Sequence, residues 1–114
     1  MDDDKQIRWL VSAYDDLPTF PKDARKESGF QLGKVQAGLE LANWKPFAEV
    51  GAGTREIRIR EANGIHSVMY VAKLEEAIYV LHCFQKKTQV TSKQDRAIST
   101  ARYRAAVNVR KEIK

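Results

Sequence analysis

The middle of the chain alternates apolar and polar residues with the period of two that β-strands have. Within Arg55–Arg60, Ile57 and Ile59 fall on one side, and Glu56, Arg58 and Arg60 fall on the other. Asn63-Gly64 is the residue pair most typical of a two-residue hairpin turn and leads into a second strand. A further turn precedes a third, mostly apolar stretch. The pattern therefore predicts an antiparallel meander of three strands, over 55–60, 67–72 and 78–84.

Ahead of this meander, the pattern predicts a short strand and a helical region. Ile7–Val11 is short and has the composition of a strand. Pro21 is a favoured first residue of a helix, and apolar residues follow it at helical intervals. Three glycines in this region each lower helix propensity by about 1 kcal/mol relative to alanine, so we expect a bend or two shorter helices. The apolar face comprises Ala24, Leu32, Val35 and Leu39, the glycines are Gly29, Gly33 and Gly38, and 43–53 has the composition of a loop.

A second helix is predicted at the end of the chain. Thr91 and Gln94 have the spacing of a capping box, in which the two side chains satisfy the first backbone N–H groups of a helix. A narrow apolar stripe follows, formed by Ile98, Ala101, Ala105 and Val109. The order strand, helix, three strands, helix predicts an α+β fold: a small twisted antiparallel sheet with helices packed on it.

The 114 residues fit one domain, of which we expect residues 1–5 to form a disordered tail. With 43% hydrophobic and 31% charged residues, the composition excludes a wholly disordered chain. No run approaches the roughly 18 to 20 apolar residues of a membrane helix. The start, Met1–Asp4, lacks the pattern of a secretory signal, and the single Cys83 is typical of a reducing compartment. We therefore expect a cytoplasmic protein.

The net charge of +5 is concentrated at one end of the sequence. Residues 84–114 carry nine basic and two acidic side chains, whereas residues 1–20 carry two basic and five acidic ones. Such a concentration attracts a polyanion or an acidic protein without sequence specificity. Alternatively, these charges form only the solvated face of a helix, and the charge distribution favours neither explanation.

Metal and phosphate-loop chemistry find little support in the residues. His66 and His82 are the two histidines, and one cysteine cannot supply a thiolate pair. Gly51–Gly53 precedes a strand, whereas phosphate-binding glycine loops lie between a strand and a helix. We therefore expect neither a metal nor another cofactor.

Cationic and aromatic side chains are concentrated on the predicted strands and at their ends. This set suits RNA cleavage without a metal, because a 2′-hydroxyl needs a base, the phosphate needs cations and the leaving oxygen needs an acid. Each candidate has a structural alternative. Arg58 and Arg60 fit a solvated stripe, His82 shares a face with Val80 and Phe84 and fits a hydrogen-bonded core histidine, and Tyr70 fits the core.

Several stretches resemble the RelE/HigB-like toxins of bacterial toxin–antitoxin pairs, in particular the phage-derived HigB-like branch. The resemblance spans about residues 7–106, and its most specific part is the Leu-His-x-Phe-x-Lys-Lys-Thr run at 81–88. The other matching stretches are Phe30–Gly38, Gly51–Arg60, Tyr70–Lys73, the cap at Thr91 and Ala101–Arg104.

The resemblance implies a RelE/ParE-like fold and a ribosome-dependent endoribonuclease that cleaves mRNA without a metal and inhibits translation. It implies that Arg58 contacts the scissile phosphate and that Lys86 and Lys87 hold RNA or stabilise the transition state. Tyr70 and His82 are the candidates for the base and the acid. The implied RNA-binding residues are Arg55, Arg60, Gln85, Arg102 and Arg104.

One departure from the family pattern concerns Ser67, which stands where an arginine is expected. Losing that cation weakens charge stabilisation at a phosphate. His66 does not replace it, because the alternation of the strand directs it to the other face. Two alternatives therefore stay open: a gyrase-poisoning toxin of the ParE type, and a catalytically weakened homologue that binds RNA or antitoxin.

All these functions imply partners. We expect a cognate antitoxin with a helix-turn-helix DNA-binding domain, whose acidic segment covers the basic face. For the nuclease we also expect the ribosome and mRNA. DNA is contacted only through the antitoxin, and no membrane is involved.

Overall fold

The computed structural model describes residues 5–10, 13–61, 64–72, 76–88 and 90–113, with side chains to residue 108. The predicted turn residue Asn63 and most of the predicted tail, residues 1–4, lie outside this part. The fold is α+β, as predicted. Its elements are β1 (Gln6–Trp9), α1 (Ala13–Asp16), a 3-10 turn (Leu17–Thr19), α2 (Lys22–Gln36), β2 (Trp44–Pro46), β3 (Thr54–Glu61), β4 (Gly64–Val71), β5 (Ala77–Lys86) and α3 (Lys93–Ile113).

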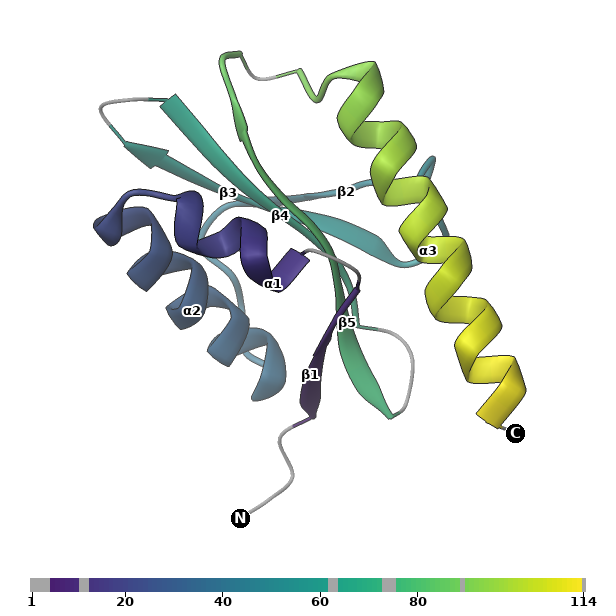
Figure 1. The fold of residues 1–114 in the computed structure, drawn as a ribbon. Helices are drawn as coiled ribbons and strands as arrows, with labels where there is room; N and C mark the ends of the chain where they lie inside the picture. The colour runs from purple at the N-terminus through teal and green to yellow at the C-terminus, as the bar shows by residue number, and fades with distance from the viewer. Residues whose placement is uncertain (1–4, 11–12, 62–63, 73–75, 89, 114) are drawn as a thin grey trace.

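The five strands form one mixed sheet in the order β1-β5-β4-β3-β2 (Figure 1). The predicted antiparallel meander β3-β4-β5 is confirmed, and β2 extends it at one edge. The prediction of an all-antiparallel sheet is wrong at the other edge, where β1 pairs with β5 in parallel and Ile7 lies opposite Ile78. A hairpin imposes antiparallel pairing, but β1 is separated from the meander by two helices, and such a crossover permits a parallel pair.

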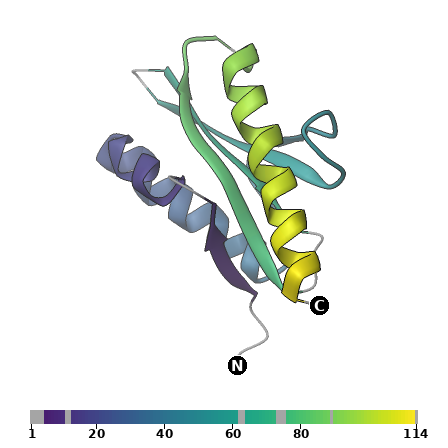
Figure 2. The same ribbon diagram turned by 45° about the vertical axis from the view of Figure 1, so that its right-hand side comes forward.

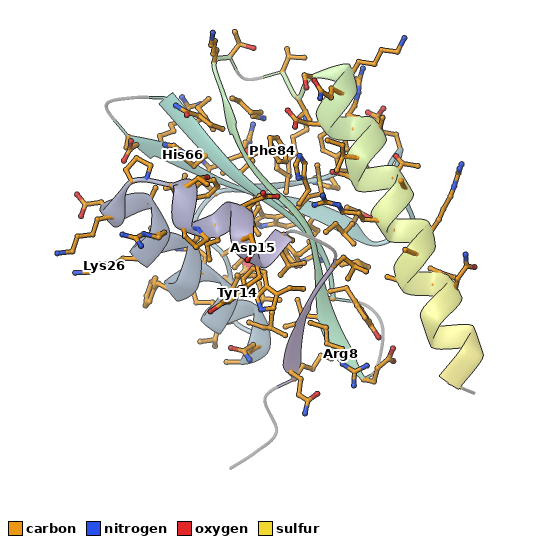
Figure 3. The ribbon with its side chains drawn as sticks, viewed as in Figure 1. Arg8, Tyr14, Asp15, Lys26, His66 and Phe84 are labelled. Atoms are coloured by element: carbon orange, nitrogen blue, oxygen red, sulfur yellow. The ribbon has the colours of Figure 1, made fainter. Side chains whose placement is uncertain are left out.

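Helices cover both faces of the sheet and enclose two cores. α1 and α2 lie on one face, over Ile57, Val68 and Ile78 (Figure 1). α3 lies on the opposite face, where the loop that includes Phe47 and Val50 completes the cover (Figure 2). Of the side chains labelled in Figure 3, His66 lies toward the α2 side and Phe84 toward the α3 side. None of the helices in the described residues is both long and apolar enough to cross a membrane.

α2 is one continuous helix, so the expected division into two shorter helices is wrong. A Cβ at Gly29 or Gly33 would meet nothing within 4 Å, and the helix is held by its packed face, on which Ala24 and Leu32 are buried. Burial of that face outweighs the low helix propensity of the glycines. The helix ends earlier than the apolar stripe suggested. Gly38 adopts φ 74° in a Schellman motif, in which Leu39 N–H donates to Lys34 O, so Leu39 lies outside the helix and is 62% exposed.

The start of α3 differs by one residue from the predicted capping box. Ser92 Oγ accepts the Asp95 backbone N–H at 3.0 Å and also contacts the Asp95 carboxylate at 2.8 Å. Thr91 is buried and turns toward Lys86 instead. The predicted stripe is also displaced: Ala101 is exposed, the side chain of Val109 lies beyond the described ones, and the buried positions are Ser99 and Ala106. The apolar pattern of the sequence does not reveal this buried face of α3, because one of its two described buried residues, Ser99, is polar.

Gly51 is needed for the contact between the 47–53 loop and α3. A Cβ atom at position 51 would overlap the Tyr103 ring, so only glycine leaves room for it. Tyr103 Oη also donates to Ala52 O at 2.9 Å. We expect Gly51→Ala to lower the free energy of unfolding by about 1–3 kcal/mol, the usual cost of overpacking. Urea unfolding measures this loss. In a Tyr103→Ala background the same change should cost little, and an equal cost in both backgrounds would contradict the explanation.

Candidate active site

A β-bulge in β5 determines where His82 points. Met69 pairs with His82 but the next residue, Tyr70, pairs with Val80, so Leu81 is the extra residue. Leu81 and His82 are consequently both directed to the α3 side, while Val80 packs on the α2 side. The prediction that His82 shares a face with Val80 is therefore wrong. The shared face with Phe84 is confirmed, since the two rings stack with centroids 4.6 Å apart.

Side chains from three elements meet at the His82 ring. Nε2 lies 2.8 Å from Oδ1 of Asp95, which the Ser92 cap holds at the start of α3. Arg102 lies further along α3. Its Nη1 donates to Leu81 O at 3.0 Å and lies 3.4 Å from His82 Nδ1. Oδ2 of Asp16, at the end of α1, lies 3.8 Å from Nδ1 and 3.7 Å from the same Arg102 nitrogen. We call His82, Asp95, Arg102 and Asp16 the His82 cluster.

The hydrogen bonds of the cluster assign a tautomer to His82. Because the Asp95 carboxylate can only accept, Nε2 carries the ring proton and donates it to Asp95. Nδ1 then keeps its lone pair and faces the Arg102 guanidinium. The cluster thus contains a base nitrogen, a carboxylate that orients the ring and a cation beside the base. This is the arrangement that general-base catalysis needs.

The cluster lies at an open edge of the sheet. β1 pairs with β5 only as far as Val80, and from Leu81 onward β5 lies between α1 and α3 (Figure 1). The imidazole is 8% exposed, but the side chains around it are more accessible: 14% for Arg102, 22% for Asp95 and 33% for Asp16. Solvent therefore contacts the cluster mainly at Asp16 and Asp95.

Burial lowers the pKa of His82 below the usual 6.5, and the Asp95 carboxylate opposes this by raising it. Arg102 adds to the lowering and Asp16 to the raising. Since burial is the largest effect, the ring is neutral at neutral pH. A neutral imidazole is the form that can accept a proton.

The lowered pKa of His82 also makes folding stability depend on pH. As the pH falls through about 6.5, the unfolded chain binds a proton that the folded chain does not, so the free energy of unfolding decreases until the pH is below the folded pKa. We expect wild type to lose more stability between about pH 7.5 and about pH 5.5 than His82→Gln does. Urea unfolding at both pH values tests this, and equal losses would refute it.

Lys86 and Ser67 belong to a buried ionic cluster rather than to the surface. Lys86 Nζ lies 2.7 Å from Oε2 of Glu56 and 3.2 Å from Thr91 Oγ1, and Ser67 Oγ donates to the same Glu56 oxygen at 2.7 Å. The Lys86 and Glu56 side chains are 2% and 0% exposed. As the alternation of β3 predicts, Glu56 and Ile57 lie on opposite faces of the sheet. Glu56 is nevertheless buried, because α3 and its neighbouring loop cover its face. An arginine at position 67 would add a second buried cation to this one carboxylate.

The remaining predicted site residues are distributed over different surfaces. Lys87, which follows β5, and Arg104, on α3, are exposed, and Arg60 is exposed on β3. Arg58 is half-buried and lines a cleft of about 360 Å³ together with Arg60 and three carboxylates: Asp23, Glu27 and Glu61. Tyr70, Arg55 and Gln85 lie in register positions that face α2, away from His82.

The structure thus brings together two of the predicted residues, His82 and Arg102, with two that the sequence did not single out. Asp95 had a signal, because Ser92 and Asp95 have the spacing of a capped helix start. Asp16 had none, since its contact with β5 depends on how α1 packs. In the described part of the chain, no group of three or more metal-ligating side chains is arranged to hold a metal ion.

Comparison with known proteins identifies one family. A family model described as phage derived protein Gp49-like (DUF891) matches residues 15–104. The matched range includes all four residues of the His82 cluster. A search of curated proteins found no match.

Proposed function

Because the chain belongs to the phage-derived Gp49-like (DUF891) family, which is of the RelE/HigB-like toxin type, we propose that it is the toxin of a toxin–antitoxin pair and cleaves mRNA on the ribosome. The observation that carries the proposal is His82, with its ring oriented by Asp95 and its unprotonated Nδ1 in contact with Arg102. The His82 base lies within hydrogen-bond reach of both the orienting carboxylate and the cation, an arrangement suited to metal-independent phosphodiester cleavage.

In this proposal His82 is the general base. Its Nδ1 takes the proton of the 2′-hydroxyl, and the 2′-oxygen attacks the neighbouring phosphorus. The Asp95 carboxylate stabilises the imidazolium that forms. Arg102 turns from Leu81 O to the phosphate and stabilises the charge that develops there. The bond to the 5′-oxygen breaks, solvent supplies the proton for that oxygen, and a 2′,3′-cyclic phosphate is left.

Other cations serve binding and positioning. Lys87 and Arg104 are exposed and suit contacts to the backbone of mRNA or ribosomal RNA. Lys86, which is paired with Glu56, acts by holding the end of β5 against the start of α3. A cognate antitoxin is the proposed partner, with an acidic segment that competes for the exposed basic side chains.

The test is primer extension on a reporter mRNA in a cell-free translation system to which the purified chain is added. We expect cuts within translated codons, and none in the same mRNA without ribosomes. Arg102→Gln should reduce cleavage by about 10²-fold or more, the usual effect of removing a donor to a developing oxyanion. Stalled gyrase complexes without mRNA cuts would favour the ParE-type alternative, and neither effect would favour a binding homologue.

A further inference from the structure

A second cleft lies on the opposite face of the sheet from His82. Its volume is about 390 Å³, and it runs between the end of α2 and the β3-β4 pair. Its apolar walls are Val35, Leu39, Leu41 and Ala72, and its polar lining is Arg55, Tyr70 and Glu40. We call it the Tyr70 cleft. None of the four residues of the His82 cluster lines it.

Tyr70 brings an unused hydrogen-bond donor to this cleft. The residue is 0% exposed, and its hydroxyl donates to no acceptor in the described part of the chain. The Arg55 guanidinium lies close to the phenol oxygen but can only donate to it. A buried donor without an acceptor is costly, and native structures retain few of them. An acceptor from outside the chain would satisfy it.

Arg55 places a cation next to that donor. It is paired with Tyr70 across the β3-β4 ladder, and its guanidinium lies 4.2 Å from the centre of the Trp44 ring. This cation–π contact restricts the exposed side chain to the mouth of the cleft. Burial raises the pKa of Tyr70 and Arg55 lowers it, as expected of a guanidinium close to the phenol. Together the two groups form a site for an anionic acceptor.

The apolar walls of the cleft indicate the kind of molecule to which the anionic group is attached. Leu39 stands at the rim and is 62% exposed because the Schellman turn at Gly38 projects it from the end of α2. Val35, Leu41 and Ala72 continue this surface inward. The walls suit an aliphatic side chain, and the ring of Trp44, which a nucleobase could stack on, is occupied by Arg55. A peptide in which an apolar residue stands next to a carboxylate matches both the apolar walls of the cleft and its pair of donors, Tyr70 and Arg55.

We propose that the Tyr70 cleft binds an acidic peptide segment of a protein partner. An aliphatic side chain of the peptide packs between Leu39 and Leu41, and the neighbouring carboxylate accepts from Tyr70 Oη and the Arg55 guanidinium. Glu40, on the same lining, weakens the binding by repulsion. This site lies across the sheet from the His82 cluster, so the proposal is independent of RNA cleavage.

The test is a titration of the isotope-labelled full chain with the capped peptide Gly-Leu-Asp-Leu-Glu-Gly, followed by NMR. The matched control peptide carries Asn and Gln in place of Asp and Glu. We expect the acidic peptide to shift the amide signals of Leu41 and Ala72, and the control peptide to bind about 10-fold more weakly, as expected for loss of a charge-assisted hydrogen bond.

Three variants separate this role from a structural one. Tyr70→Phe removes only the hydroxyl, so it should weaken peptide binding about 5- to 10-fold without lowering stability. Arg55→Gln should weaken binding similarly, whereas Glu40→Gln should strengthen it about 2-fold. Absence of binding, equal binding of both peptides, or displacement of the peptide by a short uridine oligonucleotide would overturn the proposal.

Discussion

His82→Gln is expected to reduce mRNA cleavage by about 10²- to 10⁴-fold, the usual contribution of a general base. Glutamine keeps a donor for Asp95 but offers no basic nitrogen at the position of Nδ1, so it cannot take the proton of the 2′-hydroxyl. Primer extension with equal amounts of folded protein measures the loss. His66→Gln is the matched control, because His66 is buried on the other face of the sheet and packs against Phe20. Full cleavage by His82→Gln would remove His82 from the mechanism.

The pH profile distinguishes a base from a merely structural histidine. A base works when it is unprotonated, and burial lowers the pKa of His82, so cleavage should fall off only on the acid side of about pH 6.5. Asp95→Asn removes the carboxylate that raises this pKa. The fall-off should then move to lower pH, while the maximal rate drops because the imidazolium loses its partner. A fall-off that does not move would contradict the assigned role of Asp95.

Lys86→Met is expected to lower the free energy of unfolding by about 3–5 kcal/mol, because it leaves a buried carboxylate without its cation. Glu56 would keep its hydrogen bond from Ser67, which does not replace the lost charge. Urea unfolding measures the effect. The double variant Glu56→Leu/Lys86→Met removes both charges and should recover most of the loss. If Lys86→Met alone costs less than about 1 kcal/mol, the buried pair does not stabilise the fold.

This expected cost affects how variants of the Lys-Lys pair are interpreted. Lys87 is exposed, so Lys87→Ala reports on RNA binding with little change in stability. Lys86→Ala combines any loss of function with partial unfolding. Cleavage by the two single variants should therefore be compared per folded molecule, and the double variant alone would not separate these effects.

Local pattern was sufficient for the parts of the fold whose signals lie close together in the chain. Alternation and the Asn63-Gly64 pair predicted the meander, and helical spacing after Pro21 predicted α2. The same reasoning allowed a division of α2 into two helices and predicted a capping box at Thr91, and both were wrong. Helix propensity is worth about 1 kcal/mol per glycine, which a packed helix face outweighs.

The candidate site depends on contacts that no local pattern encodes. The residue types were predictable: a histidine, arginines and lysines near the end of β5. Their orientations were not, because a single extra residue at Leu81 changes the side of the sheet that His82 faces. Lys86, which the resemblance assigned to RNA or the transition state, pairs with Glu56, thirty residues earlier in the chain.

By itself, the sequence determined the α+β class, the meander, the basic C-terminal quarter and the set of cationic and aromatic candidate side chains, because these follow from composition and short-range periodicity. Only the tertiary structure decided that β1 runs parallel to β5, that Asp16 and Asp95 flank His82, and that Tyr70 lies across the sheet from it. The reason is physical: strand pairing, bulges and the partners of buried charges depend on residues far apart in the chain, whose contacts exist only after both faces of the sheet are covered.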